Sequence, residues 1–179
     1  MTLETVIHRV LEGDVESFRF ILQRYELPVV RMIKNITNSA DASEDIAQDV
    51  FLTAYKKLAS FDPARSNFST WLFTIARNKS LNAIKRKKPL LIGDLPEKGS
   101  PRNPSDDMAR KEFYDRLDQT LQALPSRQRS AFILAEFEKL PYEEIAQIEG
   151  TRLGTIKSRI NRAKKKLRTD LIEFGGDMV

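Results

Sequence analysis

The sequence predicts an all-α protein made of two small helical domains joined by a flexible linker. Apolar residues recur at spacings of three and four through most of the chain, which is the period of an amphipathic helix. No segment shows a competing strand pattern of alternating apolar and polar residues. Residues 89–107 contain four prolines and two glycines, a composition that leaves little to pack. We therefore predict domains at residues 1–88 and 108–179, with the linker at residues 89–107 between them.

The first predicted domain opens with helices over residues 2–36. We expect these helices to break around Gly13-Asp14 and again near Pro28, because glycine and proline interrupt a helical pattern. Asp14 is a candidate N-cap for the helix that follows it.

Two further helices complete this domain. Residues 42–58 form a strongly amphipathic helix, and the loop at 59–67, which contains an Asp-Pro pair, ends it. Residues 69–87 are apolar on more than one side, which is typical of a helix at the centre of a core. The apolar side of the 42–58 helix carries Ile46, Ala47, Val50, Phe51, Ala54 and Leu58.

The second predicted domain contains a helix-turn-helix. Helices are expected at residues 108–124 and 126–137, followed by a short helix from Tyr142, a reversal at Gly150 and a last helix. Residues 151–168 include eight Lys or Arg and no Asp or Glu. A helix-turn-helix lays such a second helix in the DNA major groove, whereas a lone basic helix is usually a solvated surface. The apolar face consists of Ile156, Ile160, Ala163 and Leu167, and the opposite face of Ser158, Asn161, Arg162 and Lys165.

Composition limits the class of protein. With 179 residues, 41% of them hydrophobic, the chain can bury one moderate core or two small ones. The formal charge of +5 favours a polyanionic partner. There is no cysteine, which excludes disulfides and cysteine-ligated metals. No run is long enough for a membrane span and no signal peptide is recognisable, so we expect a soluble cytoplasmic protein without membrane insertion.

No grouping of residues indicates catalysis. The chain has no phosphate-binding loop, nucleophile elbow, paired histidines or cysteine nucleophile, so we expect a protein that is not an enzyme. We expect no cofactor either. The acidic residues around Asp45 and Asp49 have helical spacing, whereas a metal loop needs a glycine turn to converge its oxygens, so we expect no metal site.

Two segments have both a functional and a structural interpretation. Leu52 lies among acidic residues and opposite the apolar side of its helix, which fits a docking surface for a basic partner or a solvated face with one stray leucine. Residues 61–78 mix aromatics, cations and amides. Such a mixture can stack and hydrogen-bond an unstacked base, or it can be a core helix with a capped entry.

Three motifs resemble a known family. They are D-I-A-Q-[DE]-V-F at residues 45–51, F-S-T-W-L-x-x-I-A-R-N at residues 68–78 and Y-E-E-I-A at residues 142–146. Residues 43–88 look like the second conserved region of bacterial RNA polymerase sigma factors, and residues 117–168 resemble the fourth. The order of the regions and the short linker between them are similar to the extracytoplasmic function (ECF) subfamily.

The resemblance implies partners and roles for particular residues. The partners would be core RNA polymerase (the β′ clamp coiled coil and the β flap), promoter DNA and an anti-sigma factor. The set implied to bind the coiled coil is Asp45, Gln48, Asp49 and Leu52. The set implied to contact the minus-ten element is Ser60, Phe61, Arg65, Asn67, Phe68, Trp71, Arg77, Asn78, Lys85 and Arg86. The set implied to contact the minus-thirty-five element is Thr155, Lys157, Ser158, Arg159, Asn161, Arg162, Lys165 and Lys166.

The function expected from these features is promoter-specific transcription initiation. The protein would bind core polymerase, recognise two promoter elements and help to open the duplex. A stand-alone helix-turn-helix regulator is the alternative, but it would leave the acidic docking stripe and the F-S-T-W segment without a role.

Overall fold

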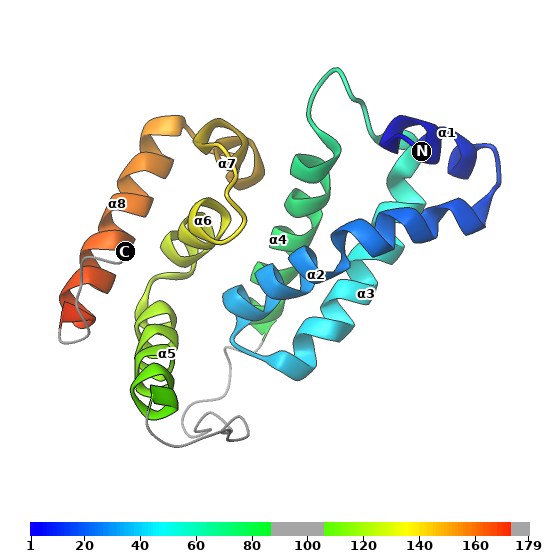
Figure 1. The fold of residues 1–179 in the computed structure, drawn as a ribbon. Helices are drawn as coiled ribbons and strands as arrows, with labels where there is room; N and C mark the ends of the chain where they lie inside the picture. Colours follow the sequence, from blue (N-terminus) through cyan, green and yellow to red (C-terminus); the bar gives the residue numbers. More distant parts are fainter. Residues whose placement is uncertain (87–105, 173–179) are drawn as a thin grey trace.

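The computed structural model describes residues 1–86 and 106–172, and every regular element in these residues is helical (Figure 1). The all-α prediction is therefore confirmed. The predicted linker lies outside the described residues, apart from its last two. The elements are α1 (Leu3–Leu11), η1 (Val15–Ser17), α2 (Phe18–Thr37), α3 (Ala40–Lys57), η2 (Leu58–Ser60), α4 (Phe68–Arg86), α5 (Asp106–Ala123), α6 (Ser126–Glu136), α7 (Tyr142–Glu149) and α8 (Leu153–Asp170).

Helices α1 to α4 form the first lobe, in which α2, α3 and α4 pack against one another. The predicted break at Gly13 is present, with φ of 103°. Asp14 caps η1, and its carboxylate accepts hydrogen bonds from the Ser17 hydroxyl and N–H. The hydroxyl donor is the main reason why the pKa of Asp14 is lowered. The short η1 leads directly into α2. Asp14 therefore caps the helical segment that follows it, as the sequence predicts.

The predicted break at Pro28 is wrong, because α2 continues through it from Phe18 to Thr37. Proline inside a helix removes one hydrogen bond and costs about 3 kcal/mol or more. The helix also buries seven residues, among them Ile21, Val29 and Ile33, each with no exposed surface. Burying each such side chain contributes about 1.5–3 kcal/mol, so the burial outweighs the local cost.

Helices α5 to α8 form the second lobe. The apolar face predicted for α8 is confirmed, since Ile156, Ile160, Ala163 and Leu167 are all buried. Leu121 of α5 and Phe132 of α6 pack on the C-terminal half of this face. None of the described helices is long and apolar enough to cross a bilayer.

The two lobes are in contact. Helix α7 packs on α4, and α6 packs on α2, so one continuous apolar cluster runs through both lobes. Ile145 of α7 and Leu134 of α6 belong to the same cluster as Leu72 of α4 and Val29 of α2. Sequence periodicity identifies buried faces but not their partners, so the sequence left open whether the chain buries one moderate core or two small ones.

An aromatic cluster supports the start of α4. Phe68 lies between Tyr25, Phe61 and Trp71, with ring centroids 5.3–5.5 Å apart, and only 3% of its surface is exposed. In this structure the Phe68 ring is therefore enclosed and is not placed to capture a base. It is a core residue, as the structural interpretation of the segment predicted, and α4 begins at Phe68 rather than Ser69.

Phe68→Ala should lower the free energy of unfolding by about 3–5 kcal/mol, because it leaves a cavity among three rings. Chemical denaturation followed by circular dichroism measures this change. Phe20→Ala is the matched control, since Phe20 is 40% exposed, and it should cost about 1 kcal/mol or less. Equal effects of the two substitutions would contradict the core assignment.

Candidate nucleic-acid interface

The turn between α7 and α8 has the geometry of a helix-turn-helix. Gly150 ends α7 with φ of 58°, a left-handed conformation that glycine adopts at little cost. Its N–H donates to the carbonyls of Ala146 and Gln147. The Thr151 N–H also donates to Ala146, and Arg152 is extended before α8 begins. The reversal that the sequence indicates at Gly150 is thus confirmed.

Helix α8 exposes most of the side chains predicted to meet DNA. Lys157, Ser158, Asn161, Arg162, Lys165 and Lys166 are exposed, and Thr155 is half-buried. Lys166 also pairs with Asp170 one turn later, at 2.9 Å between its Nζ and the carboxylate. This surface is opposite the buried apolar face and carries a strong positive charge, so it can contact phosphates and base edges.

Arg159 differs from the other predicted minus-thirty-five residues. Its side chain is 16% exposed and its guanidinium donates to Glu149 at 3.0 Å. In this structure Arg159 therefore holds α8 against α7 rather than presenting its guanidinium to a partner. Its sequence position on α8 could not reveal this, because the acceptor lies on the neighbouring helix.

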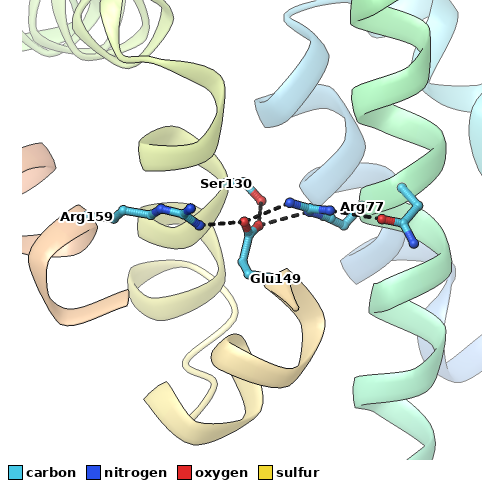
Figure 2. A network of polar contacts seen from close by, with 5 residues as sticks. Arg77, Ser130, Glu149 and Arg159 are labelled. Carbon is cyan, nitrogen blue, oxygen red and sulfur yellow. Dashed lines mark hydrogen bonds and ion pairs between the residues drawn. The ribbon is translucent and has the colours of Figure 1, made fainter. Parts of the chain in front are cut away.

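Glu149 is the centre of a buried polar network (Figure 2). Its side chain has no exposed surface. Arg77 of α4 donates to both carboxylate oxygens, at 3.1 and 2.9 Å. Ser130 of α6 donates to one oxygen at 2.7 Å, and Arg159 donates to the other. Glu149 thus joins four helices from both lobes, and sequence analysis did not identify it.

The residues predicted for the minus-ten element are spread over the η2–α4 segment. Ser60, Arg65, Asn67, Asn78, Lys85 and Arg86 are exposed, Phe61 and Trp71 are half-buried, and Phe68 is buried. Arg77 is 14% exposed because Glu149 holds its guanidinium. Arg77, Asn78 and Lys85 line one side of a cleft of about 450 Å³, and Ser126 and Arg127 of α6 line the other.

Glu144 of α7 also contacts the start of α4. It accepts a hydrogen bond from the Asn67 amide at 3.1 Å and another from the Thr70 hydroxyl at 2.6 Å. Neither Glu144 nor Thr70 was identified from the sequence. The contact is between residues 74 and 77 positions apart, so no local pattern could have indicated it.

An apolar groove of about 900 Å³ lies between α2 and α3, and it includes two of the four predicted polymerase-binding residues, Gln48 and Leu52. Leu52 is 51% exposed. Leu27 of α2, 78% exposed, lines the same groove and was missed by the sequence analysis. The sequence feature that could have indicated it is a leucine on the side of α2 that does not face the core, because an exposed apolar residue can mark a binding surface.

The two acidic residues of the predicted docking stripe are placed differently. Asp45 and Asp49 are both exposed but do not line the groove. Asp49 pairs with Lys79 of α4 at 2.6 Å, so part of its charge is already balanced within the lobe. In the described residues, no group of three or more His, Cys, Asp or Glu side chains could hold a metal ion.

Comparisons with known proteins identify the family. A model of sigma-70 region 2 matches residues 21–89, and a model of sigma-70 region 4 matches residues 114–167. The ECF sigma factor SigW of Bacillus subtilis is 30% identical, in an alignment that covers 96% of this chain and 97% of SigW. The chain belongs to the ECF sigma factors. Sigma factors direct RNA polymerase to promoters, and they are not enzymes.

Other relatives agree with this assignment. The sigma-H factor of Pseudomonas aeruginosa is 33% identical, with 92% of this chain and 91% of that protein aligned. Among solved structures, RpoE of Bartonella quintana, bound to the anti-sigma factor NepR, has a TM-score of 0.72 and 27% identity over 88% of this chain and 98% of that chain. CnrH, in complex with the cytosolic domain of CnrY, has the same TM-score over 96% and 97% of the two chains and, at 22% identity, supports the fold alone.

Two glycines of this sigma factor should respond oppositely to alanine. Gly150→Ala should cost about 1–2 kcal/mol of unfolding free energy, because an alanine at positive φ is strained. No atom lies within 4 Å of a Cβ at either glycine, so steric clash plays no part. Gly154, at the start of α8, has an ordinary helical backbone, and Gly154→Ala should stabilise by up to about 1 kcal/mol. Thermal unfolding of both variants checks the signs, and a stabilising Gly150→Ala would contradict the turn geometry.

Proposed function

We propose that this ECF sigma factor docks on core polymerase through α2 and α3, reads the upstream promoter element with α8 and engages the downstream element with the η2–α4 segment. The observation that carries the proposal is the separation of these surfaces on one chain. A basic exposed helix face and an apolar groove lie on different lobes, and a DNA-binding protein alone needs only the first.

The groove between α2 and α3 suits a helical partner. Leu27 and Leu52 provide exposed apolar surface, and Glu16, Glu26 and Glu44 are acidic residues in its lining. An amphipathic helix buries its apolar face in such a groove, and basic side chains on that helix would meet the acidic rim. The β′ clamp coiled coil is the occupant that we propose.

The exposed face of α8 suits the major groove. Arg162 can donate two parallel hydrogen bonds to a guanine, and Asn161 can pair with an adenine. Lys157 and Lys165 would contact phosphates, which adds affinity without specificity. Ser158 and Thr155, nearer the start of α8, are further candidates for base edges.

At the downstream element, the exposed side chains of Asn67, Asn78 and Lys85 would contact the separated strand. Unstacking a base costs a few kcal/mol, and contacts to the exposed strand offset part of this cost. Phe61 and Trp71 remain candidates for stacking because each is half-buried rather than enclosed. Phe68 would support them from the core.

The relatives of known structure suggest a regulatory partner. RpoE of Bartonella quintana was solved with an anti-sigma factor, and we infer that an anti-sigma factor also restrains this chain. We also propose that the protein acts in the cytoplasm, where core polymerase and promoter DNA are found.

A pull-down with core polymerase tests the main proposal, because a stand-alone helix-turn-helix regulator should not bind core enzyme in the absence of DNA. Run-off transcription with core enzyme on a promoter library then tests initiation. If the protein binds specific DNA but does not bind core polymerase, the alternative function, a stand-alone helix-turn-helix regulator, is favoured.

Leu52→Glu should weaken binding to core polymerase by about 1–3 kcal/mol if the groove is the docking surface. Leu11→Glu is the matched control, since Leu11 is 50% exposed on α1 and does not line the groove. Both variants should keep the wild-type unfolding free energy within about 0.5 kcal/mol. Titration of labelled core enzyme measures the affinities, and equal losses in the two variants would exclude the groove.

Arg162→Ala should change which upstream elements are preferred, with about 1–3 kcal/mol of discrimination lost at one position. Lys157→Ala should weaken all sequences about equally and reduce the slope of log affinity against log salt by about one unit. Binding across single-base variants of the upstream element at two salt concentrations separates the two effects. A uniform loss with Arg162→Ala would mean that α8 docks differently.

A further inference from the structure

One arginine of α8 is held inside the second lobe while its neighbours on the helix are exposed. The Arg159 guanidinium donates to a carboxylate oxygen of Glu149 at 3.0 Å, and only 16% of its side chain is exposed. Figure 2 shows Arg159 extending from α8 toward Glu149. Lys157, Ser158 and Arg162 of the same helix are exposed. The charge of Arg159 is therefore turned into the protein.

Two other cations of α8 form ion pairs, but their pairs are more exposed. Lys164 and Lys166 each pair with an acidic side chain, at 2.8 and 2.9 Å, and at least 20% of every side chain in these pairs is exposed. Exposed pairs contribute little, so a DNA phosphate can replace the acceptor. The Glu149 side chain has no exposed surface. Breaking its pair leaves a buried carboxylate short of a donor, so DNA does not readily draw Arg159 away.

Glu149 is a firm anchor, because three further hydrogen bonds hold its carboxylate. Arg77 donates to both oxygens at 3.1 and 2.9 Å, and Ser130 donates to one at 2.7 Å. Glu149 is also the last residue of α7, so its backbone is fixed by that helix. The carboxylate therefore stays in place if Arg159 is attracted by a partner.

Arg159 lies on the side of α8 that the proposed function assigns to base edges. Thr155 is four residues before it and Arg162 is three residues after it, and residues at these spacings are neighbours on one side of a helix. Both are proposed to contact bases. An arginine in such a position can donate two hydrogen bonds to a guanine. Arg159 thus has the chemistry and the helix position of a base-reading residue, but Glu149 holds its guanidinium.

We propose that Glu149 determines part of the upstream-element specificity, because it keeps Arg159 from contacting a guanine next to the base pair that Arg162 contacts. Glu149 does not touch DNA; it is a positioning residue that acts through Arg159. The inference rests on the proposed function, which makes α8 the reader of the upstream element. Release of Arg159 should add a preference for guanine at one further position.

Glu149→Gln releases Arg159 with little change of shape. The amide is similar in size to the carboxylate, but it is uncharged and its NH2 group cannot accept a hydrogen bond from an arginine. The substitution also removes one negative charge, which by itself predicts tighter binding to every sequence by the same factor. The informative result is therefore a new base preference and not an overall gain in affinity.

The measurement is binding of the holoenzyme, formed with core polymerase, to promoters that carry each single-base variant of the upstream element and a constant downstream element. Glu149→Gln should raise the preference for guanine at one position by about fivefold or more, the factor that corresponds to a good bidentate contact. Glu149→Gln combined with Arg159→Ala should lose this preference. A folded Glu149→Gln variant without a new preference, or a preference that persists without Arg159, would overturn the inference.

Ser130→Ala is the matched control. It removes one hydrogen bond to Glu149 but leaves the carboxylate and its pair with Arg159. We expect the base preferences of the wild type in this variant. If Ser130→Ala produced the same new preference, the cause would be a loosened helix-turn-helix, and the role assigned to the Glu149 charge would be wrong.

Arg159→Ala alone gives a second test, which still decides if Glu149→Gln fails to fold. Glu149 keeps Arg77 and Ser130 as donors in this variant. Because Arg159 does not read a base in the wild type, its removal should weaken binding to all upstream variants by the same factor. A selective loss at one position would show that Arg159 already reads a base and would contradict the inference.

Failure of the proposed function would look different. If Arg162→Ala also changed no base preference, α8 would not be the reader of the upstream element, whatever the result with Glu149→Gln. Circular dichroism of each variant establishes that the helices are intact.

Discussion

The arrangement of both lobes depends on the buried carboxylate of Glu149. A charge in a protein interior is stabilising only when its hydrogen-bonding capacity is filled, and removal of one partner of a buried pair commonly costs about 3–5 kcal/mol. Here two arginines and a serine fill that capacity, with donors 2.7–3.1 Å away. Donors from α4, α6 and α8 converge on this carboxylate of α7 (Figure 2). One side chain therefore couples the geometry of the helix-turn-helix to the placement of the first lobe.

This coupling leaves one of the two surfaces proposed to face DNA open and covers part of the other. The cations and amides of α8 remain exposed, whereas α4 faces the second lobe, with Arg77 and Asn67 engaged by carboxylates. The residues that line the groove between α2 and α3 all belong to the first lobe, so the contact between the lobes leaves the groove accessible to its proposed partner, core polymerase.

Several residues have roles that differ from those their sequence context indicates. Phe68, in a motif that indicates base capture, is enclosed by Tyr25, Phe61 and Trp71. Arg159 lies in the basic helix but turns toward α7, where it orients the helix-turn-helix. Leu27, next to a proline that was expected to end its helix, is among the most exposed apolar residues of the groove. For Phe68 and Arg159 the deciding contact is made by residues of other elements.

The sequence by itself determined the helical fold, most element boundaries, the reversal at Gly150 and the buried face of α8. These features depend on periodicity, capping and backbone conformation, which act over a few residues. Family motifs added the two regions and their expected partners. Only the tertiary structure decided that α2 runs through Pro28 and that Arg77 is bound to Glu149, 72 positions away. A charge on a helix surface can pair with any opposite charge that folding brings near, so the spacing of residues along the chain does not specify its partner.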